Sequence, residues 1–189
     1  MIRIGILGNI GSGKSYVAKN FGYPVFNADY EVTKLYKKDK KIFKKLKNKL
    51  PKYIYSFPIN KNEVTKAILS NKVNLQKIIS IVHLEIRKLL KLFLIKNRNK
   101  KIIILDIPLL LENKINNKND ILVFVDSKKI EIEKRLKKRL NFNRKLINKF
   151  KKIQFSSSHK KKKSNFIIKN NFKKKSLNKS IKKILNEIL

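Results

Sequence analysis

The feature that most constrains the fold is a glycine-rich turn directly after an apolar run, in the stretch "IRIGILGNIGSGKSYVAKNF". Gly8 is followed by four residues and then by Gly13, Lys14 and Ser15. The chain has five glycines, and three of them, including Gly11, lie in this turn. Glycine lets consecutive backbone N–H groups point inward, where a side chain would collide with a bound anion. The pattern is that of a P-loop, and it predicts a site for the phosphates of a nucleoside triphosphate.

The flanking sequence supports this interpretation. We expect "IRIGIL" to form a buried strand and "SYVAKNF" to open a helix whose apolar residues recur at helical spacing. The positive N-terminal end of that helix, near Lys14, would add to the phosphate site. Lys14 would bridge the terminal phosphates of ATP, and the hydroxyl of Ser15 would bind Mg²⁺. The alternative is a glycine-rich turn that matches by chance, and the motif leaves the acceptor of the phosphoryl group open.

Strands and helices are expected to alternate along the rest of the chain. "YPVF" predicts a short strand that ends at residues 27–29, and helical periodicity covers residues 31–50 and 61–96. Further strands are expected in "KIIILDIP", "DILVFVDS" and "NFIIKNN", with helices in "KKIEIEKRLKKRL" and "SLNKSIKKILNEIL". Residues 141–164 are polar and basic, which predicts a mobile segment, and the "HKKKK" run at 159–163 predicts a solvated face. The order predicts an α/β fold of three layers, a parallel sheet flanked by helices, as in P-loop NTPases.

The net charge is +37, from 49 basic and 12 acidic residues. A nucleic-acid-binding protein would explain such a charge. However, 43 of the basic residues are lysine, six are arginine, and 22 residues are asparagine, which is the usage expected of an A/T-rich genome. The chain has no cysteine, which excludes disulfides and thiolate metal sites, and no apolar run of the roughly 20 residues that span a bilayer. We therefore expect a cytoplasmic protein with no membrane partner.

Three aspartates follow predicted strands, and the carboxyl ends of parallel strands line the ligand crevice of such a sheet. Asp29 would accept a proton from an acceptor hydroxyl or orient it. Asp106, which ends "IIIL", is placed like the acidic residue that holds Mg²⁺ through water. Helix capping or a loop salt bridge is the alternative for each, and for Asp126, in "DSKK", helix capping is favoured.

Arginine is scarce, so its positions are informative. Arg135, Arg139 and Arg144 cluster before and within the basic segment 141–164, and the first two are four residues apart, which would place them on one helix face. Guanidinium groups that close over transferring phosphates are the expected chemistry of a kinase lid, and a solvated basic helix is the alternative. His83 lies among apolar residues at helical spacing, where a core or interface histidine is the alternative to a substrate ligand.

Taken in order, the motifs resemble those of the bacterial dephospho-CoA kinase family, over residues 2–171. "IGILGNIGSGKS" is similar to the family's opening loop, "NADYEVTKLY" to its Asp-Ala-Asp segment, and "HLEIRKLL" to its His-Pro helix. "LDIPLLLEN" is similar to its DxPLLxE signature, and "EKRLKKR" to its Arg-x-x-x-Arg-Asp motif. Gln154 followed by "SNFIIKN" resembles its Gln…Ala-Asp-x-x-Ile-x-Asn ending.

The resemblance implies ATP-dependent phosphorylation of the ribose 3′-hydroxyl of dephospho-CoA, with Mg²⁺, by a single domain that acts as a monomer. It implies a core at about 1–30, 100–130 and 165–189, a helical acceptor lobe at about 31–98 and a lid at about 135–164. The implied catalytic residues are Lys14, Asp29 and Arg139; those that bind the nucleotide are Gly8, Gly11, Ser12, Gly13, Lys14, Ser15, Tyr16, Arg135 and Asn170; those that bind the acceptor are Asp29, His83, Arg87 and Asp106; and those that hold the metal are Ser15 and Asp106.

The chain departs from the family pattern at five positions. Asn27 replaces the first Asp of Asp-Ala-Asp, Leu84 the proline after the histidine, and Leu140 the aspartate after Arg139, while Ser164 and Asn165 replace Ala-Asp. None of these changes removes a phosphate-binding residue or the expected base. Two alternatives stay open: another small P-loop kinase acting on a nucleoside or nucleoside monophosphate, and a basic nucleic-acid-binding protein, although no nucleic-acid motif is recognised.

Overall fold

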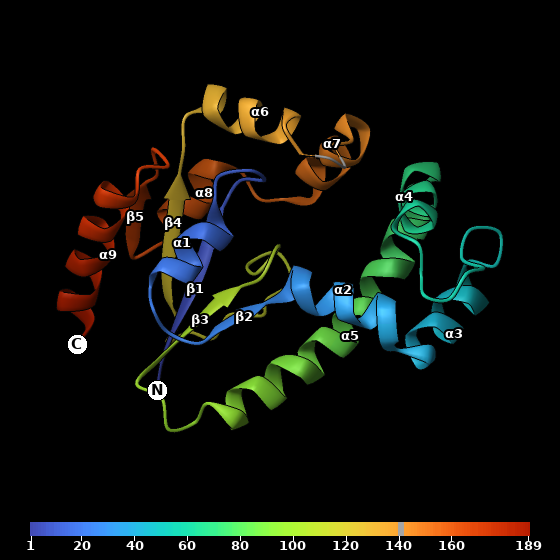
Figure 1. Cartoon of the computed structure of the whole chain (residues 1–189), viewed down its shortest axis with the longest axis horizontal. Coiled ribbons are helices and arrows are strands. Elements are labelled where there is room, and N and C mark those ends of the chain that lie inside the picture. The colour runs from blue at the N-terminus through green and yellow to red at the C-terminus, as the bar shows by residue number, and fades with distance from the viewer. Residues whose placement is uncertain (140–141) are drawn as a thin grey trace. The chain divides into compact units, whose positions relative to one another are not determined.

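The computed structural model describes residues 1–139 and 142–189. The chain divides into two compact units (Figure 1). The sheet unit comprises Met1–Asn27, Asn97–Asn143 and Lys151–Leu189, and the helical unit comprises Ala28–Lys96 and Arg144–Phe150. Each unit is built around its own apolar side chains, so each is described by itself.

The sheet unit contains five parallel strands in the order β2-β3-β1-β4-β5. Their sequences are largely aliphatic without alternation, which is typical of strands buried on both faces. All five residues of β3 and the last five of β1 are buried. The strands confirm the predicted α/β parallel sheet, and their bounds are β1 (Ile2–Gly8), β2 (Val25–Asn27), β3 (Ile102–Asp106), β4 (Ile121–Asp126) and β5 (Phe166–Lys169).

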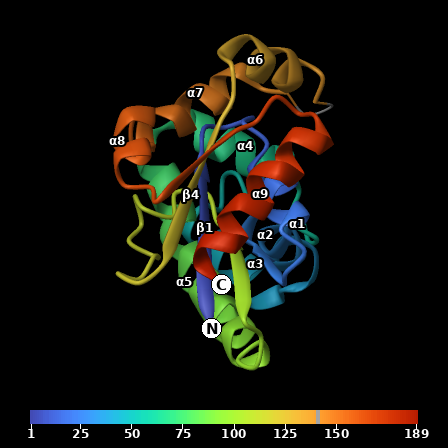
Figure 2. The same ribbon diagram turned by 90° about the vertical axis from the view of Figure 1, so that its left-hand side faces the viewer.

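Helices cover both faces of this sheet (Figure 2). On one face α1 (Lys14–Asn20) and α9 (Lys174–Ile188) lie side by side and bury Val17, Phe21 and Ile181 against alternate residues of the strands. On the other face α8 (Ser157–Lys162) packs beside β1. The unit also contains α6 (Lys129–Lys137), which follows β4. The result is the three-layer arrangement expected from the alternation of strands and helices.

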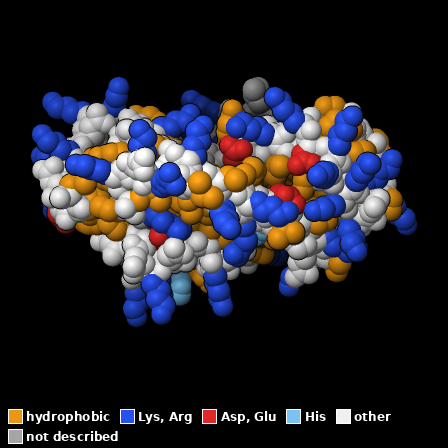
Figure 3. All heavy atoms as spheres, turned by 90° about the horizontal axis from the view of Figure 1, so that it is seen from below, with side chains coloured by type: hydrophobic (Ala, Val, Ile, Leu, Met, Phe, Trp, Pro, Cys, Tyr) orange, Lys and Arg blue, Asp and Glu red, His pale blue; other side chains and the backbone are white. Residues whose placement is uncertain are grey.

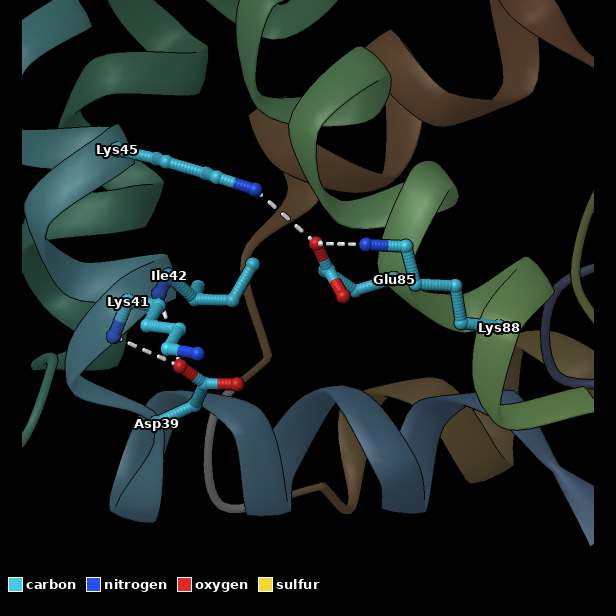
Figure 4. Close-up of polar contacts among 6 residues, drawn as sticks. All are labelled: Asp39, Lys41, Ile42, Lys45, Glu85 and Lys88. Atoms are coloured by element: carbon cyan, nitrogen blue, oxygen red, sulfur yellow. Dashed lines mark hydrogen bonds and ion pairs between the residues drawn. The ribbon is translucent and has the colours of Figure 1, made fainter. Parts of the chain in front are cut away.

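The helical unit contains α2 (Ala28–Lys38), α3 (Lys40–Lys49), α4 (Lys61–Ser70) and α5 (Lys72–Lys96), together with the first residues of α7 (Arg144–Ile153). The predicted helical stretch 31–50 is divided at Asp39, whose carboxylate accepts hydrogen bonds from the N–H groups of Lys41 and Ile42 and so caps α3 (Figure 4). In the same view Glu85 of α5 pairs with Lys45 of α3 and with Lys88, each at 3.1 Å. The contact between Lys45 and Glu85 links α3 to α5.

The described part of residues 141–164, the segment predicted to be mobile, contains α7 and α8. One detail of the predicted elements was wrong. The strand "YPVF" ends at Asn27 and α2 begins at Ala28, so Asp29 lies in the first turn of a helix and does not end a strand. The reason is that β2 is a short edge strand whose pairing with β3 stops at Asn27, after which the helix takes over the backbone hydrogen bonds.

A buried carboxylate organises the loop between α3 and α4. Glu63 of α4 is buried and accepts hydrogen bonds from the N–H groups of Tyr55 and Ser56, and from the Ser56 hydroxyl. Burial acts to raise the pKa of Glu63, but these hydrogen bonds outweigh it and hold the pKa below its ordinary value. The contribution of Glu63 to stability is therefore present at neutral pH and lost as the pH falls through its lowered folded-state pKa.

We predict that Glu63→Ala lowers the free energy of unfolding by about 2 kcal/mol at neutral pH, because it leaves buried donors without an acceptor. Denaturant unfolding measures this, with Glu133→Ala of α6, an exposed glutamate, as the control. The difference between the two variants should shrink in acid. Equal stabilities at neutral pH would contradict this role of Glu63.

Candidate active site

The predicted P-loop has the expected geometry: β1 ends at Gly8, the loop turns, and α1 begins at Lys14. Gly8 and Gly13 both have positive φ angles, of 149° and 91°. A Cβ atom on Gly13 would lie 2.5 Å from Nδ2 of Asn170, and one on Gly8 would lie 2.8 Å from the carbonyl oxygen of Val125. Neither position can accept a larger residue without moving its neighbours, so the close curl of the loop depends on glycine.

The loop is fastened to the sheet through one carbonyl group. The oxygen of Ser12 accepts hydrogen bonds from the hydroxyl of Ser127 and from the side-chain amide of Asn170, both at 2.9 Å. Ser12 is buried, and among the described residues its hydroxyl has no hydrogen-bond partner. Asn170, expected near the adenine of ATP, is itself buried and therefore acts in this structure as a support of the loop.

Lys14 lies along the inside of the loop. Its ammonium group donates to the carbonyl oxygens of Gly8 at 3.1 Å and Asn9 at 3.0 Å. Ser15 and Tyr16 follow in the first turn of α1, and both are exposed. The described side chains thus place an ammonium group and a hydroxyl group at one turn of backbone, the pair of groups that the motif predicts for phosphate and Mg²⁺.

Two aspartates end strands that neighbour β1. Asp106 ends β3, is buried, and accepts a hydrogen bond of 2.5 Å from the side-chain amide of Asn27, its register partner on β2. Asp126 ends β4, and its carboxylate pairs with Lys161 at 2.7 Å. The expectation that Asp126 caps a helix was wrong, because the N-cap of α6 is Lys128. The salt-bridge alternative describes Asp126 correctly.

The Ser15 hydroxyl is suited to bind Mg²⁺ directly, and the Asp106 carboxylate is suited to bind it through water. Among residues 1–139 and 142–189, no three histidine, cysteine, aspartate or glutamate side chains gather as a metal cage. Mg²⁺ commonly keeps several waters and binds through one or two protein oxygens plus the phosphates of its substrate, so a cage is not required. The hydroxyl of Ser15 and the buried carboxylate of Asp106 are oxygen ligands of the kind that this ion prefers.

The arginines lie differently from the expectation. Arg135 is on α6, and its guanidinium group stacks on the ring of Phe172, 4.1 Å from the centroid. The helix ends at Lys137, so Arg139 is not on the same helix face, and that expectation was wrong. Leu136 is buried, and Lys137, Lys138 and Arg139 after it are exposed. Arg144 begins α7, and Leu140, a departure from the family pattern, lies outside the described residues.

The expected acceptor residues belong to the helical unit. Asp29 is exposed on α2, and its backbone carbonyl accepts a hydrogen bond from the hydroxyl of Thr33 at 2.9 Å. His83 and Arg87 are four residues apart on α5 and so share one face. Burial lowers the pKa of His83, and the positive charge of Arg87 lowers it further. His83 is therefore neutral at physiological pH, able to donate or accept a hydrogen bond.

Sequence reasoning missed Lys160, one of several polar residues that lie beside the loop. Gly8 and Lys14 line an open hollow, whose wall also includes Glu112, Gln154 and Lys160. Lys160 was expected on a solvated face within the run "HKKKK", but it is 3% exposed. Its ammonium group lies 3.2 Å from Glu112, which explains its burial. The glutamate of "LDIPLLLEN" was the one signal in the sequence that could have drawn attention to a partner.

The distribution of basic side chains can be followed on one face of the molecule. On the face shown in Figure 3, Lys and Arg side chains are spread among apolar and neutral groups and do not gather in one stripe. None of the helices in the described part of the chain combines the length and apolar character needed to cross a bilayer.

The order of the five parallel strands and the glycine loop after β1 define the class of protein, which is that of the P-loop kinases. TT1252 from Thermus thermophilus has a similar solved structure, with a TM-score of 0.81 and 26% identity over 100% of this chain and 98% of that chain. The dephospho-CoA kinase from Campylobacter jejuni has a similar fold, with a TM-score of 0.60 and 22% identity over 98% and 96% of the two chains.

Residues 2–176 match the family model described as dephospho-CoA kinase. The chain is 33% identical to the dephospho-CoA kinase of Wolbachia pipientis wMel, over 98% of this chain and 97% of the relative. It is 30% identical to that of Ehrlichia canis (strain Jake), over 98% and 95%. The chain belongs to the dephospho-CoA kinase family, and as a kinase it takes its phosphoryl group from ATP.

We predict that Gly13→Ala destabilises the chain by about 2 kcal/mol more than Gly22→Ala, because both residues have positive φ but only Gly13 also has a neighbour in the way. Thermal unfolding compares the two variants, and calorimetry with MgATP should show loss of binding in Gly13→Ala alone. Equal behaviour of the two variants would show that the close contact with Asn170 does not matter.

Proposed function

We propose that this chain transfers the γ-phosphoryl group of ATP to the ribose 3′-hydroxyl of dephospho-CoA, giving CoA and ADP, the last step of coenzyme A biosynthesis. The observation that carries the proposal is the family match over residues 2–176, in a chain whose glycine loop is closed against Asn170 and Val125 and lined by Lys14. The alternative of a kinase for nucleosides or nucleoside monophosphates shares the loop but not the family match.

In the proposed reaction the 3′-oxygen of the acceptor attacks the γ-phosphorus, and a new P–O bond forms. The bond from that phosphorus to the β,γ-bridging oxygen breaks, its electron pair leaves with ADP, and the hydroxyl proton passes to Asp29. The backbone N–H groups between Gly8 and Tyr16 bind phosphate oxygens, and Lys14 leaves the loop carbonyls to neutralise charge on the terminal phosphates. Most of the rate enhancement is then positioning and charge neutralisation.

Two further sets of residues complete the proposed nucleotide site. The hydroxyl of Ser15 would hold Mg²⁺ directly and Asp106 would hold it through water, and the ion would supply charge neutralisation at the phosphates. Arg139 and Arg135 would bind phosphates or the base from the lid. The stacking of Arg135 on Phe172 supports a place for Arg135 close to Gly13, since the same ring would contact a Cβ atom on Gly13.

The proposed organisation assigns the acceptor to the helical unit. The core at about 1–30, 100–130 and 165–189 would bind ATP, the lobe at about 31–98 would bind dephospho-CoA through Asp29, His83 and Arg87, and a lid at about 135–164 would close over the phosphates. A neutral His83 suits a hydrogen bond to a hydroxyl or phosphate oxygen of the acceptor. A monomeric, cytoplasmic enzyme without a specific nucleic-acid partner stays our prediction.

We predict that Asp29→Asn keeps MgATP binding and lowers kcat by about 10²–10⁴-fold, because an amide cannot take the hydroxyl proton. Calorimetry with MgATP and a steady-state assay with dephospho-CoA measure the two effects separately. Asp39→Asn, at the N-cap of α3 in the same unit, is the matched control and should keep its turnover. Near-normal turnover of Asp29→Asn would remove Asp29 from the role of base.

The acceptor itself is tested with the wild-type chain and a panel of substrates. We expect ADP release with MgATP and dephospho-CoA, and little with nucleosides or nucleoside monophosphates, because the family match rather than the loop defines the acceptor. Lys14→Ala should abolish release, since it removes the charge that lies along the loop. Faster turnover of a monophosphate would favour the alternative kinase.

A further inference from the structure

The hollow beside the P-loop holds an ion pair that the reaction scheme does not use. Side chains of Lys160 and Glu112 are 4% and 8% exposed, and the ammonium nitrogen lies 3.2 Å from Oε1 of Glu112. The same oxygen accepts a hydrogen bond of 2.8 Å from the N–H group of Phe155. One carboxylate oxygen thus serves both a buried cation and a backbone donor.

Such a pair is not explained by stability. Taking an ammonium group out of water carries a penalty of several kcal/mol, and an ion pair offsets it only when its geometry is good and the remaining donors are satisfied. The ammonium group of Lys160 has three N–H donors. In the described part of the chain, the carboxylate within ion-pair distance of it is that of Glu112. Apolar residues of similar volume often serve a core equally well.

The position of the pair suggests what else the lysine can bind. Lys160 lines the hollow together with Gly8 and Lys14, and the loop carbonyl of Gly8 accepts a hydrogen bond from Lys14. All of these residues belong to the sheet unit. Two ammonium groups therefore border one small space at the end of β1, where the loop motif predicts the terminal phosphates.

The surroundings of Lys160 differ from those of the two lysines that follow it. Lys161, next along α8, pairs with Asp126, and Lys162 is exposed to solvent. Of these three consecutive lysines, only Lys160 is buried and lines the hollow. Glu112 comes from the segment that follows β3, and its contact with the N–H group of Phe155 ties the chain just before α8 to that segment.

We propose that Lys160 is a second phosphate-binding cation of the site, which contacts the transferring γ-phosphoryl group, and that Glu112 is the positioning residue that holds it at the hollow. The inference rests on the proposed function. As the acceptor oxygen bonds to the γ-phosphorus and the bond to the β,γ-bridging oxygen breaks with its electron pair leaving on ADP, Lys160 neutralises charge on the phosphoryl oxygens and transfers no proton.

The experiment separates this role from a structural one. Lys160→Met alone would leave Glu112 buried without its cation, so the informative variant is the double substitution Glu112→Gln with Lys160→Met, which removes both charges and keeps an acceptor for Phe155. Lys162→Met, in the same helix, is the matched control. Thermal unfolding, turnover with dephospho-CoA, and calorimetry with ADP and with the β,γ-imido analogue of ATP are measured for each.

We expect the folded double variant to lose about 100-fold in kcat. Its affinity for the ATP analogue should fall about tenfold, as for a lost charged hydrogen bond, while that for ADP is kept, because ADP lacks the γ-phosphoryl group. Turnover within about threefold of wild type, or equal losses for both nucleotides, would overturn the proposal. If the double variant does not fold, the double substitution Glu112→Gln with Lys160→Gln, which also removes both charges, is read by the same criteria.

The two proposals fail in different ways. A wild-type chain that releases no ADP with dephospho-CoA would overturn the proposed acceptor, while the comparison of ADP with the ATP analogue would still report on Lys160. A wild-type chain with full activity whose double variant is equally active would overturn the role of Lys160 alone.

Discussion

The site depends on one tight curl of backbone, the loop from Gly8 to Gly13, and on the single carbonyl group that holds it. The oxygen of Ser12 is bound by Ser127, just after β4, and by Asn170, just after β5. Because β4 pairs with β1 and β5 pairs with β4, all in parallel, the strand order brings both supports to the end of the sheet where β1 ends. A loop made of flexible glycine is thereby fixed before any ligand binds, which reduces the entropy lost on binding.

Acidic residues are scarce in this chain, so few of its basic side chains can form an ion pair. With 12 acidic against 49 basic residues, most lysines have no carboxylate to pair with, and the surface carries them in solvent. The few acids in the sheet unit hold particular cations: Asp120 pairs with Arg3, Asp126 with Lys161, and Glu112 with Lys160. These carboxylates distinguish the lysines and the arginine that have a fixed partner from the many that look alike in the sequence.

The sequence was sufficient for the parts whose signal is local. Aliphatic runs predicted the strands, and the spacing of glycines, Lys14 and Ser15 predicted the loop, because glycine conformation and strand burial leave a mark on adjacent residues. Contacts between distant segments leave none. Lys160 and Lys162 look alike within "HKKKK", and only Glu112, far away in the chain, distinguishes the buried one. Two other differences from the sequence predictions also come from contacts between distant segments. Asp126 forms an ion pair with Lys161, and β2 ends where its pairing with β3 ends.

The central claim, that backbone N–H groups of the loop bind the phosphates, can be measured with ¹⁵N-glycine labelling, because the chain has only five glycines. Adding MgADP or the β,γ-imido analogue of ATP with Mg²⁺ should shift the amide signals of Gly11 and Gly13 strongly. Gly22, beyond α1, should not move. Unchanged signals of Gly11 and Gly13 at a nucleotide concentration that supports turnover would contradict the account.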